Sequence, residues 1–563
     1  MKIYSYILSF FLFLGIVSCN ESKWLKEEPK DFYTTENSYN TTAQFNEALN
    51  YMYDRLRDLY WNLDDNKTPL HFGDIAFGGT DYPDLKFNNF GTFFTPTTSA
   101  TLSYWKTAYN IIANANIVIN RIGHDNEVAE QDKAQIKGEA LFFRAFFYRF
   151  LGHLYGGVPL VLEEVSTPRR DYVRATREEV YQQAVYDLEE AIILLSDIDQ
   201  VKDGKVSKQA AQHLIAEVYI SIGKYDKAIE AATAVIDYPK MALMTNRFGT
   251  KADDMEGNPY WDLFQLNNQN RSTSGNTETI LALQHEYQNS GSNYGCNMPR
   301  YILPNYYNTK VEGKNGDVVI ALTTFTAEKG GRGIGVIQPT DYFLQNIWEE
   351  DFNMDYRNSS KMIVRDYRID NPDAKGYGEW MIKDGWLEDN DKIRQFYPFV
   401  MKFSRVGYFP DESYAKNADG SIKTTALGEH ALINSNNSAN YSFKDEYLFR
   451  LAGTYLLRAE AFLNIGQTDK AAADINKLRS RANASLISAS DVNMDFILDE
   501  QLRELYFEDF RVLTLCRLNK LVDRTRKYNP CGANIKDNQN ILPIPYSEIE
   551  RNIFATIEQN PGY

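Results

Sequence analysis

Two distant stretches of this chain repeat one pattern of small and aromatic residues. The first stretch carries Ala216, Tyr219, Gly223, Tyr225, Ala228, Ala232 and Val235, and the second carries Ala459, Phe462, Gly466, Ala471, Ile475 and Leu478 at the same offsets. Apolar residues spaced in this way share one face of a helix, and a glycine between two such runs marks a turn. Each stretch therefore predicts a helical hairpin that must stack on further hairpins to bury its apolar stripe.

Partial copies of the pattern occur elsewhere in the chain. They comprise Ala48 and Tyr51; Ala108, Ile112 and Ala115; Ala145, Tyr148 and Gly152; and Ala184, Leu188 and Ala191. Together with the two full copies they make about four helix pairs, two of them split by insertions. We therefore predict a mainly α fold, namely a tetratricopeptide-like helical repeat scaffold with a large irregular, loop-rich inserted subdomain.

The insertions define the predicted domain organisation. Residues 61–102 interrupt the first helix pair, and residues 241–445 separate the third pair from the fourth. Both stretches are rich in Gly, Asn, Asp and Tyr and lack a long helical period. We expect a repeat scaffold at 44–240, an inserted ligand-binding subdomain at 241–445, and the last repeat pair with C-terminal helices at 446–563, because binding residues concentrate on loops.

The start of the chain has the features of a targeting segment. Residues 7–17 are almost wholly apolar, Lys2 is the only charge before them, and the run is too short to span a bilayer. Ile16-Val17-Ser18-Cys19 resembles the lipobox of a bacterial lipoprotein, although an ordinary signal peptide cut elsewhere is the alternative. We predict a signal peptide at 1–18, lipidation of Cys19 and a polar tether at 19–43.

Composition narrows the classes of partner. The net charge of −16 disfavours nucleic acid and anionic lipid headgroups, which the summed field would repel. If Cys19 is lipidated, the three remaining cysteines cannot form a disulfide framework. Tyrosine leads an aromatic content of 14%, which suits surfaces that meet a partly hydrated ligand, although most of these rings are expected in the core.

The sequence offers no clear catalytic site. It lacks HExxH, CxxC, GxSxG and GxxxxGK[ST], and its six histidines show no metal-binding spacing. Acidic pairs have no diagnostic value among 76 acids. Residues 331–335 are predicted to form a flexible glycine-rich loop, and residues 388–391 a solvated acidic turn rather than a Ca²⁺ site. We expect a non-enzyme without a metal or cofactor.

Several segments, in their order and spacing, together resemble the SusD/RagB family of nutrient-binding outer-membrane lipoproteins. They are the lipobox, KWLKEEPKDFYTTENSYNT just after it, YWKTAYNIIANANIVINRI at 104–122, GEALFFRAFFYRFLGHLYGGVPLV at 138–161, EYLFRLAGTYLLRAEAFLNIG at 446–466, INKLRSRA at 475–482, ILPIPYSEIERN and the terminal EQNPGY. The chain departs from the family pattern within 503–518, where Val512-Leu513-Thr514 replaces the usual aromatic and acidic residues. This departure puts only the packing of the last helices in doubt.

The resemblance implies a function. Family members bind oligosaccharides at the cell surface and deliver them to a partner TonB-dependent, SusC-like β-barrel transporter in the outer membrane. A lipid anchor at Cys19 would hold this chain there, facing the cell exterior. The alternatives are a peptide or other nutrient as ligand, a membrane-anchored glycoside hydrolase, and a protein-interaction scaffold.

The resemblance also indicates where a ligand would lie, namely on two segments of the loop-rich face. In this chain they are DIAFGGTDYPDLKF at 74–87 and EYQNSGSNYGCNMPRY at 286–301. The predicted ligand-binding residues are Asp81, Tyr82, Tyr287, Tyr294, Cys296, Tyr301, Arg368 and Tyr397. Trp105 and Trp261 are predicted to be core residues instead.

Overall fold

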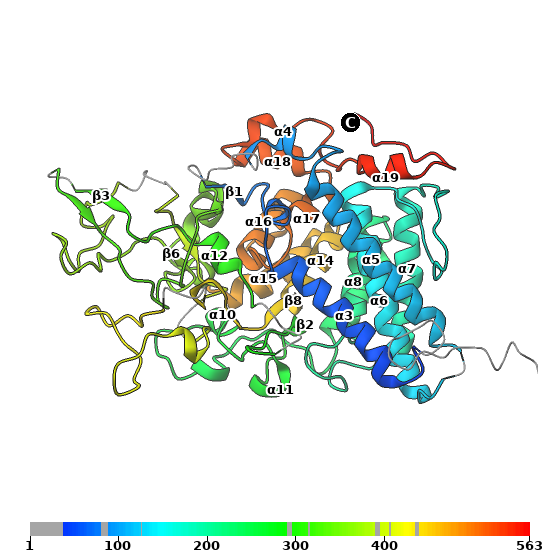
Figure 1. Cartoon of the computed structure of the whole chain (residues 1–563), viewed down its shortest axis with the longest axis horizontal. Helices are drawn as coiled ribbons and strands as arrows, with labels where there is room; N and C mark the ends of the chain where they lie inside the picture. The colour runs from blue at the N-terminus through cyan, green and yellow to red at the C-terminus, as the bar shows by residue number, and fades with distance from the viewer. Residues whose placement is uncertain are drawn as a thin grey trace, which may run out of the picture.

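A computed structural model describes residues 38–79, 88–124, 126–289, 295–313, 316–388, 394–404, 407–433 and 438–563. The predictions for Cys19, Asp81, Tyr82 and Tyr294 fall outside these ranges and stay predictions. Figure 1 shows two halves: long helices on one side, and short elements joined by loops on the other. Among the described residues, no helix combines the length and the apolar character that crossing a membrane would require.

The helical half consists of four packed pairs. Helix α3 (Thr42–Trp61) packs on α5 (Ser99–Arg121), α6 (Glu130–Tyr155) on α7 (Arg177–Leu194), α8 (Lys208–Ser221) on α9 (Tyr225–Ile236), and α14 (Leu451–Asn464) on α15 (Thr468–Arg481). Helix α14 also packs on α9, so the fourth pair stacks on the third in spite of the long insertion between them. The predicted mainly α repeat scaffold is confirmed.

The two full copies of the pattern share one turn. Gly223 and Gly466 have φ angles of 72° and 75°, in the left-handed region. The residue after each glycine donates its N–H to a carbonyl on the preceding helix: Lys224 to Tyr219 and Gln467 to Phe462. A side chain at the glycine would cost about 1 kcal/mol or more there, which explains why the glycine recurs in the pattern.

The prediction that Ala48 and Tyr51 mark the buried face of the first helix was wrong. The buried stripe of α3 is Phe45, Leu49, Met52 and Leu56, and Tyr51 is 40% exposed. The hydroxyl of Tyr51 donates a hydrogen bond to Asn110 at the surface, and Ala48 is only partly buried. Residues at positions 45, 49, 52 and 56 share a helix face, and the apolar side chains there, rather than the small residue of the pattern, determine how α3 packs.

The segment between α9 and α14 contains only short elements. Its helices include α10 (Pro259–Asp262), α11 (Arg271–Ser274), α12 (Met298–Ile302) and α13 (Asp341–Leu344). Its strands form antiparallel pairs: β2 (Thr279–Leu283) with β8 (Glu446–Arg450), β3 (Lys310–Glu312) with β4 (Val318–Ile320), and β6 (Ile363–Val364) with β7 (Phe399–Val400). Its strand β5 (Ile337–Pro339) pairs with β1 (Ala76–Gly78), which belongs to the first insertion. Strand β8 leads directly into α14, which joins this segment to the repeats.

The C-terminal helices are α16 (Met494–Leu505), α17 (Arg511–Arg517), α18 (Leu521–Tyr528) and α19 (Tyr546–Arg551). Of these, α16 and α17 lie near the centre of the molecule, and α18 and α19 lie along its upper edge in Figure 1. Helix α16 packs on α14, and α17 packs on α6. Val512 and Leu513, where the chain departs from the family pattern, are fully buried. The apolar residues at that point therefore contribute to the core.

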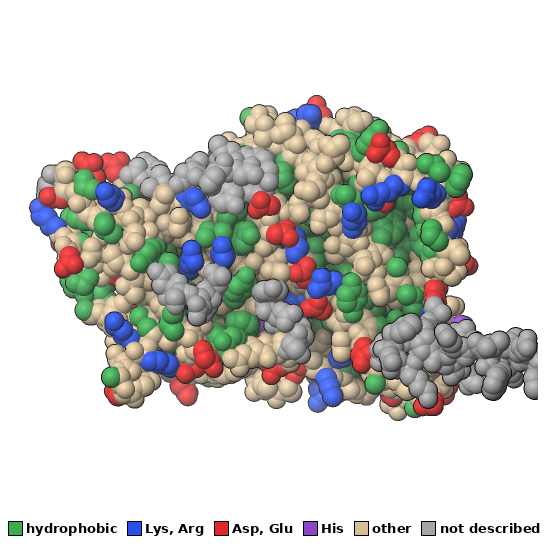
Figure 2. All heavy atoms as spheres, in the orientation of Figure 1, with side chains coloured by type: hydrophobic (Ala, Val, Ile, Leu, Met, Phe, Trp, Pro, Cys, Tyr) green, Lys and Arg blue, Asp and Glu red, His purple; other side chains and the backbone are tan. Residues whose placement is uncertain are grey.

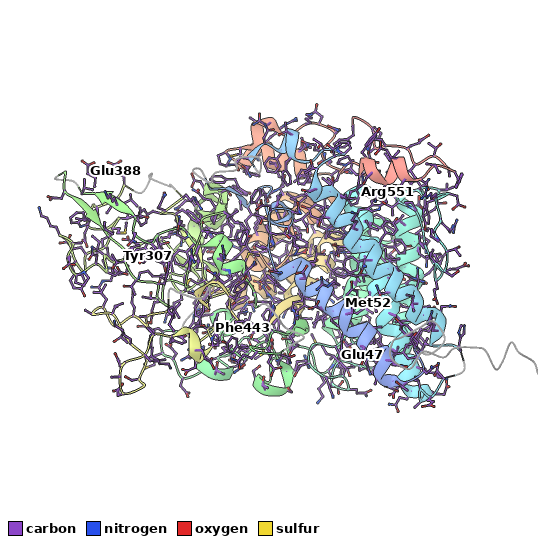
Figure 3. All side chains as sticks on the ribbon, viewed as in Figure 1. Glu47, Met52, Tyr307, Glu388, Phe443 and Arg551 are labelled. Atoms are coloured by element: carbon purple, nitrogen blue, oxygen red, sulfur yellow. The ribbon has the colours of Figure 1, made fainter. Side chains whose placement is uncertain are left out.

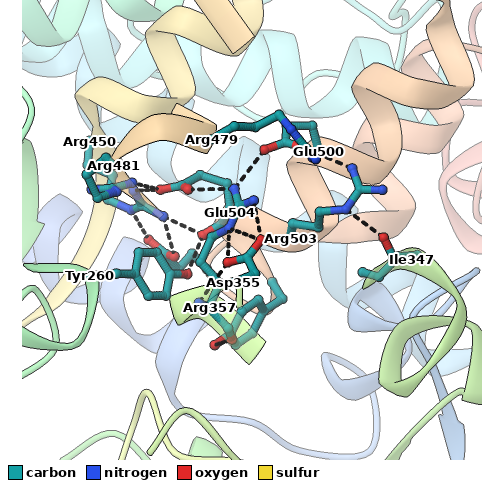
Figure 4. A network of polar contacts seen from close by, with 12 residues as sticks. Tyr260, Ile347, Asp355, Arg357, Arg450, Arg479, Arg481, Glu500, Arg503 and Glu504 are labelled. Atoms are coloured by element: carbon teal, nitrogen blue, oxygen red, sulfur yellow. Dashed lines mark hydrogen bonds and ion pairs between the residues drawn. The ribbon is translucent and has the colours of Figure 1, made fainter. Parts of the chain in front are cut away.

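A buried network of ion pairs ties the loop-rich half to the helices (Figure 4). Glu504 on α16 accepts hydrogen bonds from Arg450, Arg481 and Arg357, at 3.1 Å for Arg357. Arg357 belongs to the long insertion, whereas Arg450 and Arg481 belong to β8 and α15. Neighbouring Glu500 accepts from Arg357, Arg479 and Arg503. Because these groups are buried, each charge depends on its partners to offset the loss of hydration.

Acid should destabilise the protein through this network. Burial alone would raise the pKa of Glu500 and Glu504, but the facing arginines outweigh it and lower both, that of Glu500 to about 2 from 4.5. Since the folded-state pKa lies below the unfolded value, the stabilisation is complete above pH 4.5 and is lost as the pH falls toward 2. Denaturant titrations should show the free energy of unfolding falling below pH 4.5. A constant free energy of unfolding between pH 5 and pH 3 would show that ionised Glu500 and Glu504 do not stabilise the folded protein.

Candidate functional site

Val336, the residue just before strand β5, joins the two predicted ligand-binding segments. The N–H of Val336 donates to the carbonyl of Tyr301 at 3.0 Å, and the carbonyl of Val336 accepts from the N–H of Gly79 at 3.1 Å. Gly79 belongs to the first segment and Tyr301 to the second. We call this place the β1–β5 junction and define it by Gly79, Val336 and Tyr301.

The described residues on either side of positions 80–87 meet at the junction. The side chain of Asn88 accepts from the N–H of Gly78 at 2.7 Å and donates to the carbonyl of the same residue at 3.0 Å. Gly78 and Asn88 are therefore in contact beside β5. Asp81 and Tyr82 lie in the sequence between Gly79 and Asn88, so the prediction that they contact a ligand stays a prediction about residues whose described flanks are at this junction.

Two glycines allow the backbones to approach each other at the junction. A Cβ atom at Gly79 would collide with the carbonyl oxygen of Gly335, so no larger residue fits there without a shift. Gly335 itself has a φ angle of 67° and lies against Arg394, whose Nε donates to the carbonyl of Ile334 at 2.7 Å. These contacts fix the path of the backbone at Gly79 and Gly335.

The glycine-rich stretch at 331–335 is not the flexible loop predicted from its composition. The backbone N–H groups of Arg332, Ile334 and Gly335 donate to carbonyls of other segments, and that of Gly331 donates to the nearby carbonyl of Thr326. The three glycines of this stretch are buried. The glycines serve close packing here, and the stretch supports the junction from below.

Aromatic and basic side chains lie on the segments that flank the junction. Tyr301 is partly buried on α12, and Tyr307 stacks on Phe325 with ring centroids 4.6 Å apart. The guanidinium of Arg332 lies 6.0 Å from the centre of the Phe325 ring. The side chain of Arg300 makes no hydrogen bond to any residue that the structure describes. Rings and guanidinium donors of this kind can bind a ligand that has both apolar faces and hydroxyls.

Tyr287 occupies a different place on the loop-rich half. Its side chain is 38% exposed and meets Phe443 edge to face at 5.0 Å. The preceding residue, Glu286, lines a groove of about 350 Å³ between α3 and residues 202–205. Figure 3 shows Phe443 and Tyr307 in separate parts of this half. Tyr287 is therefore accessible, but it stands apart from the aromatic residues beside the junction.

Two predicted residues are interior ones. Cys296 is fully buried, exchanges two backbone hydrogen bonds with Ser442, and has a thiol pKa raised by burial. Tyr397 is 3% exposed, and its hydroxyl lies within hydrogen-bond distance of the carbonyls of Ile302, at 3.1 Å, and Ile337, at 3.3 Å. Because neither side chain faces solvent, we no longer count them as ligand contacts; Tyr397 supports β5 from beneath. Trp105 and Trp261 are buried, as expected.

Arg368 is exposed and has a neighbour that the sequence reasoning missed. Its guanidinium lies 5.6 Å from the ring centre of Trp380, an exposed tryptophan. Trp380 stands in the stretch KGYGEW, where glycine and charged residues surround an aromatic one. Tyr294 was predicted to bind a ligand because it is an aromatic residue in a stretch rich in glycine and polar residues, and the same reasoning could have identified Trp380.

The surface around these residues is mixed in character. Figure 2 shows hydrophobic patches between scattered acidic and basic side chains over both halves. Within the described ranges, no group of three or more His, Cys, Asp or Glu side chains is placed to hold a metal ion. Residues 389–391 of the acidic turn lie outside the described ranges. The candidate site therefore consists of aromatic rings and hydrogen-bonding groups.

Two family descriptions match the chain. The SusD family matches residues 261–563, and the family described as "Starch-binding associating with outer membrane" matches residues 23–220. SusD-like protein P2 of Formosa agariphila is 26% identical over 570 residues, which cover 98% of each chain. Starch-binding protein SusD of Bacteroides thetaiotaomicron is 37% identical over 132 residues, or 22% of this chain and 23% of that one.

Solved structures share the fold. A laminarin-binding SusD-like protein superposes with a TM-score of 0.66 at 23% identity, covering 93% of this chain and 100% of that chain. Surface glycan-binding protein A from Bacteroides thetaiotaomicron, solved in complex with laminarihexaose, has a TM-score of 0.64 at 19% identity and covers 92% and 99%. Because the SusD family description alone matches more than half of the sequence, the chain belongs to the SusD family.

Proposed function

We propose that this protein is a non-catalytic, lipid-anchored glycan-binding protein at the cell surface. It captures an oligosaccharide and delivers it to a TonB-dependent, SusC-like transporter in the outer membrane. Membership of the SusD family supports this role, and so do the names of relatives that bind starch or laminarin. The observation that carries the location of the site is the pair of hydrogen bonds by which Val336 joins Gly79 to Tyr301.

The chemistry at the β1–β5 junction suits a sugar chain. A pyranose ring has an apolar C–H face that stacks on an aromatic ring, and hydroxyls that accept hydrogen bonds from guanidinium groups. Tyr82 and Tyr301 would supply rings, and Arg300 and Asp81 would supply a donor and an acceptor. A ligand of this kind needs no metal, cofactor or nucleophile in order to be held.

A glycan array with residues 20–563 tests the binding function. We expect saturable binding to one class of oligosaccharide, with no smaller sugars released after prolonged incubation. Release of shorter products would instead identify a glycoside hydrolase. Binding of peptides without any glycan would identify a peptide-binding member of the family.

Purification from the native membrane tests the partnership. A protein that is anchored by lipid without crossing the membrane cannot move a ligand through it, so a β-barrel partner must do so. Extraction in a mild detergent should recover the protein together with a TonB-dependent transporter. Repeated recovery of the protein alone would contradict delivery to a transporter and favour a scaffold role.

A further inference from the structure

Trp380 is the one exposed tryptophan in the part of the chain that the structure describes. Its exposed fraction is 36%, whereas the other described tryptophans are buried at 8% or less: Trp61, Trp105, Trp261, Trp348 and Trp386. Tryptophan is the largest apolar side chain, and exposing it forgoes the free energy that burial would provide. Its exposure therefore needs a reason that packing does not supply.

The backbone holds Trp380 in a defined position. The N–H of Ile369 donates to the carbonyl of Glu379 at 2.9 Å, and the N–H of Met381 donates to the carbonyl of Tyr367 at 2.9 Å. Tyr367 is buried and stacks on Phe399 with centroids 5.4 Å apart. The turn that carries Trp380 is thus fixed to the core through its backbone, while the side chain stays 36% exposed.

Unused hydrogen-bonding groups lie beside the ring. Arg368 donates from Nε to the carbonyl of Gly378 at 3.1 Å, which holds its guanidinium against the indole. The terminal nitrogens of Arg368 and the indole N–H of Trp380 have no hydrogen-bond partner among the described residues. Asp384 accepts from the backbone N–H of Trp380, and Tyr377, also exposed, stands on the same turn.

We propose that Trp380 and Arg368 form an accessory glycan-binding platform, additional to the β1–β5 junction. The indole stacks on the C–H face of a pyranose residue, and the terminal nitrogens of Arg368 donate to its hydroxyls. The inference rests on the proposed glycan-binding function. A second contact of this kind raises the affinity for a long polysaccharide through a higher effective concentration, more than for a short oligosaccharide.

The test compares Trp380→Ala with the wild-type chain, using laminarin, starch and xylan as polysaccharides and the corresponding hexasaccharides. Trp380→Ala should weaken binding of the recognised polysaccharide about fivefold, and Arg368→Ala should weaken it in the same direction. Phe554→Ala is the matched control, because Phe554 is an exposed aromatic residue near the C-terminus. Its affinity should equal that of the wild-type chain.

Fluorescence gives a second readout. Because the other described tryptophans are buried, titrating polysaccharide should shift the emission of the wild-type chain and not that of Trp380→Phe, in which a ring is retained. Unchanged affinity in Trp380→Ala, in a wild-type chain that binds a polysaccharide, would overturn the platform and leave the proposed function standing. If the wild-type chain binds none of the six probes, both the platform and the proposed binding of these glycans would be contradicted.

Discussion

Glu504→Gln should lower the free energy of unfolding by about 3–5 kcal/mol. Glu504 is fully buried and accepts hydrogen bonds from Arg357, Arg450 and Arg481. Glutamine has almost the same shape but no charge, so three buried guanidinium groups lose a shared counter-charge. The variant should also loosen the link between the loop-rich half and α15, because the two sides meet at this carboxylate.

Glu256→Gln is the matched control for this prediction. The side chain of Glu256 is 80% exposed and pairs with Lys361 at 2.9 Å. Exposed ion pairs contribute little, so the same chemical change should alter the free energy of unfolding by less than about 1 kcal/mol. Urea denaturation of both variants provides the comparison. Equal stability of Glu504→Gln and Glu256→Gln would show that the buried network does not hold the two halves together.

Cys19→Ala should abolish lipidation entirely. If Cys19 is the residue that carries the acyl chains, its sulfur is required for attachment, and the variant should no longer incorporate radioactive palmitate. Without acyl chains a protein of this kind has only weak affinity for a membrane. We therefore expect an uncleaved precursor or a protein released from the membrane fraction.

Cys531→Ala provides the control for lipidation. Cys531 is a free, partly buried cysteine in the C-terminal region, so its removal should leave palmitate labelling intact. Continued labelling of Cys19→Ala would show that the chain is not a lipoprotein anchored at this residue, and that the signal peptide is cut elsewhere.

The repeat scaffold could be predicted because the residues that determine each helical hairpin are close together in the sequence. Gly223 and Gly466 mark turns that only a residue tolerant of positive φ can form, and small residues at fixed offsets let adjacent helices approach. Tyr51 failed as a marker because the apolar side chains of α3, which include Phe45 and Leu49, lie on a different face of the helix. The long insertion gave no such local signal, since partners such as Arg357 and Glu504 are far apart in the sequence.

The candidate site was predictable only at the level of segments. The composition of 74–87 and 286–301 indicated loops, and the resemblance indicated which loops bind a ligand. Burial of Cys296 and Tyr397 could not be seen from their neighbours, because it follows from pairing with Ser442 and from support of Ile337. The meeting of the two segments across Val336 is likewise a long-range contact that no short pattern encodes.

Calorimetric titration of site variants is the most direct test that the β1–β5 junction binds a glycan. The wild-type chain is titrated with the oligosaccharide identified on the array, beside Tyr82→Ala from the first segment and Arg300→Ala from the second. We predict about tenfold weaker binding in each variant, or about 1.4 kcal/mol, with nearly unchanged melting temperature. Tyr546→Ala, an exposed tyrosine on α19, should bind like wild type. Wild-type affinity in both site variants would contradict the assignment of the glycan-binding site to the β1–β5 junction.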